Sequence, residues 1–436
     1  MVDTFCPIPW NSQAIRSNGD VRLCCHANIA KNKGTLCNSK GYPYNAANDD
    51  LVEARNSNLI RSIRQNMLEG KWSEECNRCK SEEQSGLNSK RNYEKERWRM
   101  SLEDVADTTA NDGTIDTDLF PTVYYDIRFG NLCNLACRMC GPQDSNGWYS
   151  DWNLLHGKDW FNDTHGREQM YKQKNKWVSD SYNWHSSDSF WKQIESNSKN
   201  VKHVYMAGGE PMLIERHYEF LERCIENGAA KNMVVEYNTN MTSIPTRVLD
   251  LWQHFKAIEI GASIDGYGSV QEYQRYPSEW KKILKNIYKV DAAPNNISAW
   301  FAYTVTAYNV LHLPDFMRWK LESSGLNKFN NSLRRPIVTH HLAYKPLYLN
   351  IRVLPKGYKS LVKERFDQFR NWMLQEKYPE HVLASSESIY KSVINYMMSE
   401  DYHNSHWEEF CDYTNKLDQI RNQQILDVIP QLREYL

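Results

Sequence analysis

The chain has 436 residues, of which 41% are hydrophobic and 12% aromatic, and its formal net charge is -1. This composition excludes a disordered chain, and the length suits a core of roughly two to three hundred residues with additions at both ends. The charge excludes the basic balance of most duplex nucleic-acid binders, and no signal-like start or apolar run of about 18 residues occurs, so we expect a soluble, cytoplasmic protein without a membrane partner.

Cysteines are concentrated in the first third of the chain. We expect thiolates that bind metal in a reducing compartment, because a disulfide scaffold would be shorter and exported. Residues 1–101 form the first predicted domain, and spacing alone leaves a zinc ribbon, a two-iron cluster and a four-iron cluster open for it. Its cysteines are Cys6, Cys24, Cys25, Cys37, Cys76 and Cys79.

An acidic, polar stretch at 102–118 predicts a linker, and residues 119–335 then alternate short β-branched or aromatic runs with helical patterns. Apolar residues recur at every third or fourth position in 214–228 and 279–291, which favours strand-helix units and a parallel sheet. We therefore predict an α/β fold with a partial (β/α)6 TIM-type barrel. The six predicted strands are 122–129, 202–208, 232–239, 257–264, 297–305 and 336–342.

Two further segments flank or interrupt this barrel. The insertion at 141–200 is rich in tryptophan, and we expect most of these rings in packing and some at a substrate mouth. A second loose stretch at 325–336 precedes the C-terminal extension, 336–436, which is predicted to be mostly helical. The tryptophans of the insertion are Trp148, Trp152, Trp160, Trp177, Trp184 and Trp191.

The sequence GNLCNLACRMCGP follows the first strand and places Cys133, Cys137 and Cys140 at spacing C-x3-C-x2-C. Three thiolates can hold three irons of a four-iron cluster and leave the fourth iron free for a small molecule, whereas an electron-transfer cluster normally takes four cysteines. A zinc site completed by a remote residue is the alternative, but closed zinc sites favour paired Cys-x2-Cys knuckles.

Polar or flexible residues also end the next three predicted strands. Because carboxyl ends of parallel strands meet at one barrel end, we expect them around a shared pocket. Glycine permits close backbone approach, and a carboxylate can pair with an ammonium group. These residues are Gly208, Gly209, Glu210, Asn240, Ser263 and Asp265.

The motifs CNLACRMC, AGGEP, TNM, SIDG and QRYPSEWKKILKNI, between residue 120 and about 325, resemble those of the radical S-adenosylmethionine (radical SAM) superfamily, in particular its branch with a SPASM or twitch domain. The resemblance implies a [4Fe-4S] cluster on Cys133, Cys137 and Cys140 and S-adenosylmethionine as cofactor. It implies that the Gly-Gly-Glu motif meets the methionyl amine, and Met139 stands where relatives carry an aromatic residue near the adenine. The implied cofactor-binding residues are Met139, Gly208, Gly209, Glu210, Asn240, Ser263, Asp265 and Arg275.

The N-terminal cysteines resemble the two halves of an auxiliary-cluster domain. The resemblance implies a second, fully ligated cluster, expected to be [4Fe-4S], with Cys25 as a substitute for Cys24 and with Cys37 outside it. In most relatives such a domain follows the barrel, whereas here it precedes it, so the resemblance does not predict how it docks. The implied ligands are Cys6, Cys24, Cys76 and Cys79.

We expect an enzyme that cleaves S-adenosylmethionine reductively, with flavodoxin or ferredoxin as electron donor, and takes hydrogen from a peptide or protein residue. A nucleotide or nucleobase substrate, in a viral enzyme acting in the host cytoplasm, is the second hypothesis, and a redox sensor or scaffold without turnover is the third. Cys37, Cys224 and Cys411 are available hydrogen donors, although we expect Cys224 in the core. A basic stretch predicts either a phosphate or acidic-peptide cradle or a solvated face; its residues are Arg334, Arg335, Lys345, Arg352 and Lys356.

Overall fold

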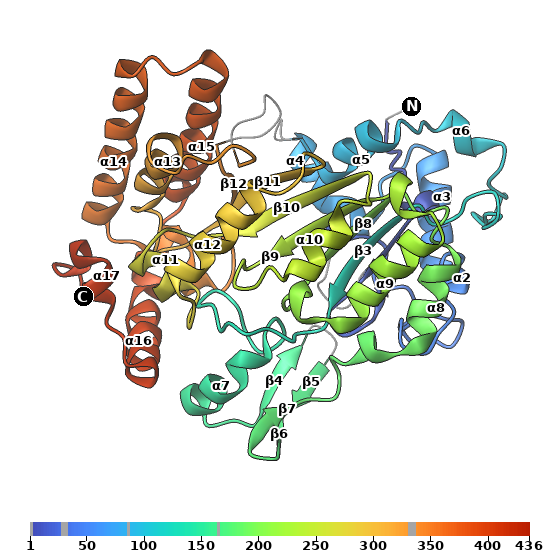
Figure 1. The fold of residues 1–436 in the computed structure, drawn as a ribbon, viewed down its shortest axis with the longest axis horizontal. Coiled ribbons are helices and arrows are strands. Elements are labelled where there is room, and N and C mark those ends of the chain that lie inside the picture. The colour runs from blue at the N-terminus through green and yellow to red at the C-terminus, as the bar shows by residue number, and fades with distance from the viewer. Residues whose placement is uncertain (1–2, 28–33, 85–87, 164–165, 330–336) are drawn as a thin grey trace. The chain divides into compact units, whose positions relative to one another are not determined.

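The computed structural model describes residues 3–27, 34–84, 88–163, 166–329 and 337–436 (Figure 1). The chain divides into two compact units. The first comprises Met1–Leu132, Asp159–Tyr237 and Asp250–Ile258, and the second comprises Cys133–Lys158, Asn238–Leu249 and Glu259–Leu436. None of the described helices is long and apolar enough to cross a membrane.

All six predicted strands are present, which confirms the α/β class. They are β3 (Tyr124–Phe129), β8 (His203–Gly208), β9 (Val234–Thr239), β10 (Ala257–Ser263), β11 (Ile297–Val305) and β12 (Thr339–Leu342). In the first unit, β3, β8 and β9 pair in parallel, and in the second, β11 and β12 do. Most residues of β11 are buried, as in parallel strands that are covered on both faces.

The N-terminal region joins the sheet of the first unit. Strand β1 (Ser12–Ile15) pairs in parallel with β3, and β2 (Val21–Arg22) pairs antiparallel with β1, so the strand order within this unit is β9-β8-β3-β1-β2. Ala14 on β1, Asp126 on β3, Tyr205 on β8 and Glu236 on β9 therefore form one row across four strands.

Short helices complete the N-terminal region. The fully buried Arg64 of α3 donates hydrogen bonds to the carbonyl oxygens of Pro9, Arg55 and Gly113. Residues 102–118, where we predicted a linker, include α6 and contribute the Thr109 hydroxyl, which accepts a hydrogen bond from Trp10 at 2.9 Å. The helices are α1 (Ile8–Asn11), α2 (Leu51–Ala54), α3 (Asn58–Leu68), α4 (Asn77–Gln84), α5 (Lys90–Trp98) and α6 (Glu103–Ala106).

The insertion at 141–200 contains helix α7 in the second unit and two β-hairpins followed by α8 in the first. Trp148, Trp184 and Trp191 are buried, and the other three tryptophans are partly exposed. The predicted packing role thus holds for half of these rings. The bounds are α7 (Tyr149–His156), β4 (Trp160–Asp163), β5 (Gly166–Gln169), β6 (Tyr171–Gln173), β7 (Lys176–Val178) and α8 (Asp188–Ser196).

The connecting helices appear where the apolar spacing predicted them. Helix α9 (Glu215–Glu226) buries Phe220, Leu221 and Cys224, which confirms the core position of Cys224, and α12 (Trp280–Asp291) buries Ile283 and Ile287. The others are α10 (Thr246–Trp252), α11 (Ser269–Gln274) and α13 (Leu313–Glu322).

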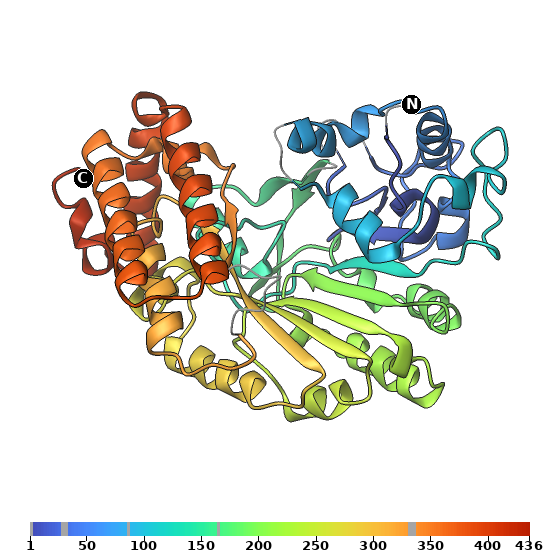
Figure 2. The same ribbon diagram turned by 90° about the horizontal axis from the view of Figure 1, so that it is seen from above.

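The C-terminal part of the second unit is helical, as predicted. Helices α14 (Lys356–Gln375) and α15 (Glu380–Ser399) form a hairpin, and α16 (His403–Arg421) follows; Figure 2 draws these helices in orange and red. The short helix α17 (Ile425–Val428) follows. The domain boundaries 1–101, 102–118, 119–335 and 336–436 stay predictions.

Candidate metal centres

Cys133, Cys137 and Cys140 lie on one loop of the second unit. The side chains of Cys137 and Cys140 are hydrogen-bonded, and the Cys140 amide donates to the Cys137 carbonyl oxygen at 2.9 Å. The hydrogen bond from Cys140 is the largest cause that lowers the pKa of the Cys137 thiol, and the nearby Arg275 cation lowers it further against the effect of burial. A thiol with a lowered pKa beside a cation readily gives the thiolate that binds metal.

The loop cannot form its own core, so neighbouring residues fix its backbone. The Ala136 amide donates to the Tyr276 carbonyl at 2.6 Å, and the Arg138 amide donates to the Gln274 carbonyl at 2.8 Å. The indole of Trp148 donates to the Cys137 carbonyl at 2.9 Å. These bonds hold the segment between the first and last cysteine against the end of α11.

Two predicted cofactor-binding residues contact the cysteines directly. The Asn240 amide nitrogen is 3.8 Å from Cys133 Sγ and donates to Asn134 Oδ1 at 3.0 Å. Arg275 Nη1 is 3.9 Å from Cys137 Sγ. The structure thus brings a cation and an amide donor to the sulfur atoms of this loop.

Asp265 is fully buried and forms an ion pair with Arg275, with 2.6 Å between Nε and Oδ2. Its other oxygen accepts from the Thr304 amide at 2.7 Å. Ser263 and Met139 lie in the same unit and are partly exposed. In the second unit, Asp265 therefore orients the cation that faces Cys137.

The Gly-Gly-Glu motif belongs to the first unit, where Gly208 ends β8 beside Phe129 of β3. Gly208 has a φ of +115°, and a Cβ on Gly209 would lie 2.2 Å from the Leu132 carbonyl oxygen, so both positions need glycine. The buried Glu210 accepts a hydrogen bond from the Met212 amide at 3.2 Å. The motif thus places a buried carboxylate at the carboxyl end of β8.

A second group of cysteines lines one cavity of the first unit. Cys6, Cys24, Cys76 and Cys79 all face it, together with His26. Cys24 and Cys25 both line an adjacent small cavity with Asp126 and Tyr124, and Cys37 lies elsewhere, beside Thr35. The structure therefore gathers the four cysteines that are predicted as ligands in one cavity, which neither Cys25, the predicted substitute for Cys24, nor Cys37 lines.

The electrostatics of this cavity fit a metal group. Burial raises the pKa of the Cys24 thiol to about 11 and holds that of Cys6 well above its usual range. The charges of Cys24, Cys76 and Cys79 raise the pKa of Cys6 further. Four such thiols ionise together only if a cationic partner compensates their charge, which is what metal binding supplies.

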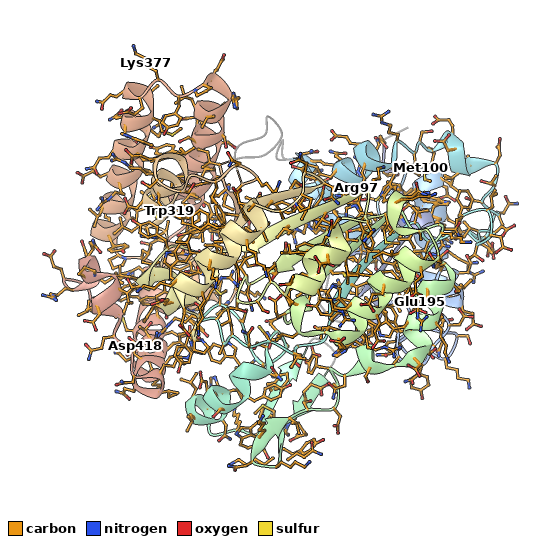
Figure 3. All side chains as sticks on the ribbon, in the orientation of Figure 1. Arg97, Met100, Glu195, Trp319, Lys377 and Asp418 are labelled. Carbon is orange, nitrogen blue, oxygen red and sulfur yellow. The ribbon has the colours of Figure 1, made fainter. Side chains whose placement is uncertain are left out.

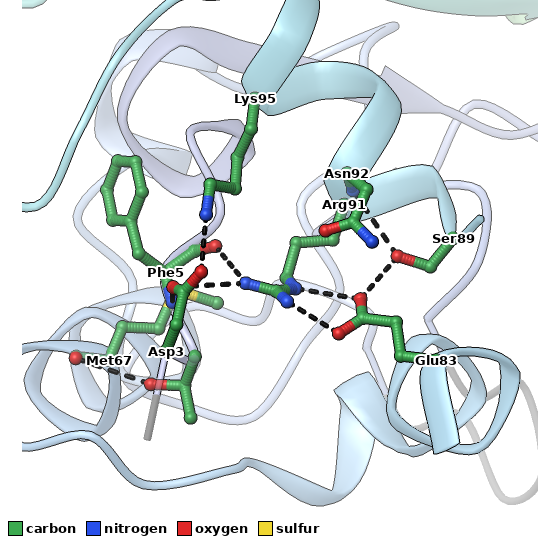
Figure 4. Close-up of polar contacts among 9 residues, drawn as sticks. Asp3, Phe5, Met67, Glu83, Ser89, Arg91, Asn92 and Lys95 are labelled. Carbon is green, nitrogen blue, oxygen red and sulfur yellow. Dashed lines mark hydrogen bonds and ion pairs between the residues drawn. The ribbon is translucent and has the colours of Figure 1, made fainter. Parts of the chain in front are cut away.

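A network of charged side chains braces one wall of the cavity (Figure 4). Arg91 on α5 pairs with Glu83 on α4, with 2.5 Å between Nη2 and Oε2, and donates to the Phe5 carbonyl at 2.9 Å. Asp3 accepts from Arg91 at 3.2 Å and from Lys95 at 2.5 Å. These bonds connect the segment before Cys6 to α4, which directly follows Cys76 and carries Cys79, and to α5.

His26 is a residue that the motif-based prediction missed. One ligand atom each from His26, Cys79 and Glu82 lie within 4.8 Å of one another, so these residues could also hold a metal ion. The only sequence signal was its position directly after Cys24 and Cys25. Glu82 follows Cys79 by three residues, which places both on one face of α4.

The residues of the predicted basic stretch differ in their surroundings. Arg334 and Arg335 lie outside the described residues. Arg352 stacks on the Tyr396 ring at 3.8 Å, donates to the Ser399 hydroxyl at 2.6 Å and pairs with Glu400 at 3.3 Å. Lys345 and Lys356 are exposed. Arg352 thus bonds the end of α15, and with a side chain only 13% exposed it is not part of a solvated face.

Residues 127–305 match the family model of the radical SAM superfamily. The match runs from within β3 to the end of β11 and includes the three-cysteine loop, so this part of the chain is similar to radical SAM domains, and the predicted partial-barrel fold class is confirmed.

Among solved structures, the chain is similar to SuiB of Streptococcus suis bound to S-adenosylmethionine, with 13% identity, 77% of this chain and 66% of that chain covered, and a TM-score of 0.32. It is also similar to SuiB bound to the precursor peptide SuiA, with 11% identity, coverages of 80% and 71%, and a TM-score of 0.30. A structure of TYW1 with a lysine-pyruvate adduct gives 10% identity, coverages of 58% and 70%, and a TM-score of 0.28. The chain spans just under two thirds of the first SuiB chain, and no curated protein matches it.

Substitution of Gly209 tests the close approach at the end of β8. In Gly209→Ala the new methyl group would overlap the Leu132 carbonyl, so we expect a lower melting temperature by circular dichroism. Gly166→Ala on β5 is the matched control, because nothing lies within 4 Å of its Cβ position. Equal melting temperatures for the two variants would contradict the packing described for Gly209.

Proposed function

We propose that the chain is an enzyme that binds a [4Fe-4S] cluster on Cys133, Cys137 and Cys140 and cleaves S-adenosylmethionine. The supporting observation is the three-cysteine loop itself, with the lowered pKa of Cys137 and the Arg275 cation 3.9 Å from its sulfur. The loop supplies three thiolates where an electron-transfer cluster takes four, so one iron keeps a position for the cofactor. When bound, this group would supply one electron to S-adenosylmethionine, which yields methionine and a 5'-deoxyadenosyl radical.

The protein residues would bind and orient the cofactor. Glu210 would pair with the methionyl amine beside Gly208 and Gly209, whose lack of side chains leaves the backbone accessible. Arg275, oriented by Asp265, would meet the carboxylate. The remaining proposed contacts are Asn240, Ser263 and Met139, with the Met139 thioether against the adenine.

We also propose a second cluster on Cys6, Cys24, Cys76 and Cys79. Their shared cavity and mutually raised pKa values support a closed site with four ligands. A [4Fe-4S] cluster is the first assignment, and a two-iron cluster or zinc are the alternatives that the donor set also accepts. Cys24 is favoured over Cys25 because Cys24 lines the cavity shared by Cys6, Cys76 and Cys79, whereas Cys25 does not.

The proposed substrate is a peptide or protein residue that loses a hydrogen atom to the radical. This rests on the resemblance of the N-terminal cysteine pattern to auxiliary-cluster domains, which is an analogy of fold and motif. A flavodoxin or ferredoxin would donate the electron, and a reducing cytoplasm would keep the seven ligand thiols available. Arg352 of the basic stretch bonds Ser399 and pairs with Glu400 in the helical extension, which does not favour a nucleotide substrate there.

Anaerobic reconstitution tests the cofactor-cleaving site. Wild type should release 5'-deoxyadenosine from S-adenosylmethionine under dithionite, and a Cys133, Cys137 and Cys140 triple-alanine variant should release none while keeping the iron of one cluster. Iron per chain and the released nucleoside are the two measurements. Iron binding by wild type without any cleavage would contradict the enzyme and favour the sensor or scaffold hypothesis.

A comparison of two adjacent cysteines tests the second site. Cys24→Ala should lose the iron of the second cluster, because Cys24 faces the four-cysteine cavity, whereas Cys25→Ala should keep it. Iron content and the visible absorption spectrum report the difference, and Cys37→Ala is a further control. Loss of iron from Cys25→Ala but not from Cys24→Ala would reverse the ligand assignment, and zinc in place of iron would change the metal.

A further inference from the structure

The C-terminal helix α16 packs against the three-cysteine loop within the second unit. Leu417 of α16 forms a fully buried hydrophobic contact with Ala136 of the loop and with Trp148. Cys140 and Tyr413 pack against the same cluster. A helix near the end of the described chain thus covers the loop that is proposed to hold the cofactor-cleaving cluster.

Arg138 is the main link between the loop and this helix. It stands between Cys137 and Cys140, and its side chain has no exposed surface. Its guanidinium stacks on the Tyr273 ring at 3.5 Å, pairs with Asp418 of α16 and donates to Gln423 Oε1 at 3.0 Å. Asp418, labelled in Figure 3, also accepts from the Tyr273 hydroxyl at 2.9 Å.

The backbone of the same residue is held as well. Tyr413 of α16 donates its hydroxyl hydrogen to the Arg138 carbonyl oxygen at 3.1 Å, and the Arg138 amide donates to the Gln274 carbonyl at 2.8 Å. The peptide segment between Cys137 and Cys140 is therefore fixed from both sides. Its position depends on residues about 280 positions away in the sequence.

A second buried arginine joins α16 to the residues that support the loop. Arg421 pairs with Asp151 of α7 at 2.8 Å, and its guanidinium lies 4.7 Å from the ring centres of both Trp148 and Tyr276. Trp148 and Tyr276 are the residues that bond the Cys137 carbonyl and the Ala136 amide. Both arginines therefore act on the same stretch of the loop.

Burying a charged group costs free energy, so two buried arginines at one loop are weak evidence for a purely stabilising role. Residues that orient metal ligands from outside are a known use of such polar networks, because they fix the ligands before the metal binds. The ion pair of Asp412 with Lys416 on the same helix provides a contrast, since both side chains are more than half exposed.

We propose that α16 is a positioning element for the cluster: Asp418 and Tyr413 hold Arg138, and through it the Cys137–Cys140 segment, in the shape that binds iron. The inference rests on the proposed function of this loop. The proposal gives the C-terminal extension a role in retaining the cluster. This extension lies outside both the family match at 127–305 and the cysteine motif.

Asp418→Asn in the full chain tests the proposal. Removal of the carboxylate charge should leave Arg138 without its anion and loosen the loop, so a chelator should strip iron from this site roughly ten- to a hundred-fold faster than from wild type. The loop's share of iron release is the phase that the Cys133, Cys137 and Cys140 triple-alanine variant lacks. The electron paramagnetic resonance line shape of the reduced loop cluster should change in the same variant, and Asp418→Glu should partly restore both.

Asp412→Asn is the matched control on the same helix and should match wild type. A folded Asp418→Asn with wild-type release rate and line shape would overturn the proposal, even if its melting temperature fell, because a merely structural pair would give that result. If Asp418→Asn does not fold, Tyr413→Phe decides: faster release at an unchanged melting temperature supports the proposal, and an unchanged rate refutes it. A wild type without any loop phase would instead refute the proposed function of the loop.

Discussion

The desolvation of Arg138 is the constraint on which the second unit depends. A guanidinium without exposed surface is tolerated only where aromatic rings and an anion replace its water, so Tyr273 of α11 and Asp418 of α16 must lie against one short loop. Those two contacts bring the end of α11 and the C-terminal helix to the cysteines. The resulting arrangement also places Arg275, the residue just after α11, beside the Cys137 sulfur. One buried cation thus links the shape of the loop to the electrostatics of its thiols.

In the first unit, the N-terminal cysteine region extends the barrel sheet. Because β1 pairs with β3, the cysteines that follow β2 and those carried near α4 meet beside the first barrel strand. Lys90 of α5 lines both the four-cysteine cavity and the smaller one that contains Cys25 and Asp126. The proposed second metal site would therefore be held in place by sheet pairing and by the Arg91 network.

The sequence was most informative where signals are local. The six strands and helices α9 and α12 carry clear apolar periodicity, and the cysteine motifs identified the residues that the structure gathers in one cavity. Two features escaped because their partners are distant in sequence. The four residues of β1 have no strong strand pattern, and their parallel partner β3 is distant in sequence. Likewise, no local signal connects Arg138 with Asp418. His26 escaped because a single histidine beside two cysteines lacks a defined ligand spacing.

The three-cysteine loop is proposed to hold a cluster with one iron open to S-adenosylmethionine. The four-cysteine cavity is proposed to hold a cluster whose ligands are all cysteines. The most direct measurement is the electron paramagnetic resonance spectrum of the reduced full chain before and after addition of S-adenosylmethionine. The account predicts two cluster signals, of which only the one missing from the Cys133, Cys137 and Cys140 triple-alanine variant changes when the cofactor binds. A spectrum in which S-adenosylmethionine alters neither signal, or alters the signal that the triple variant retains, would contradict it.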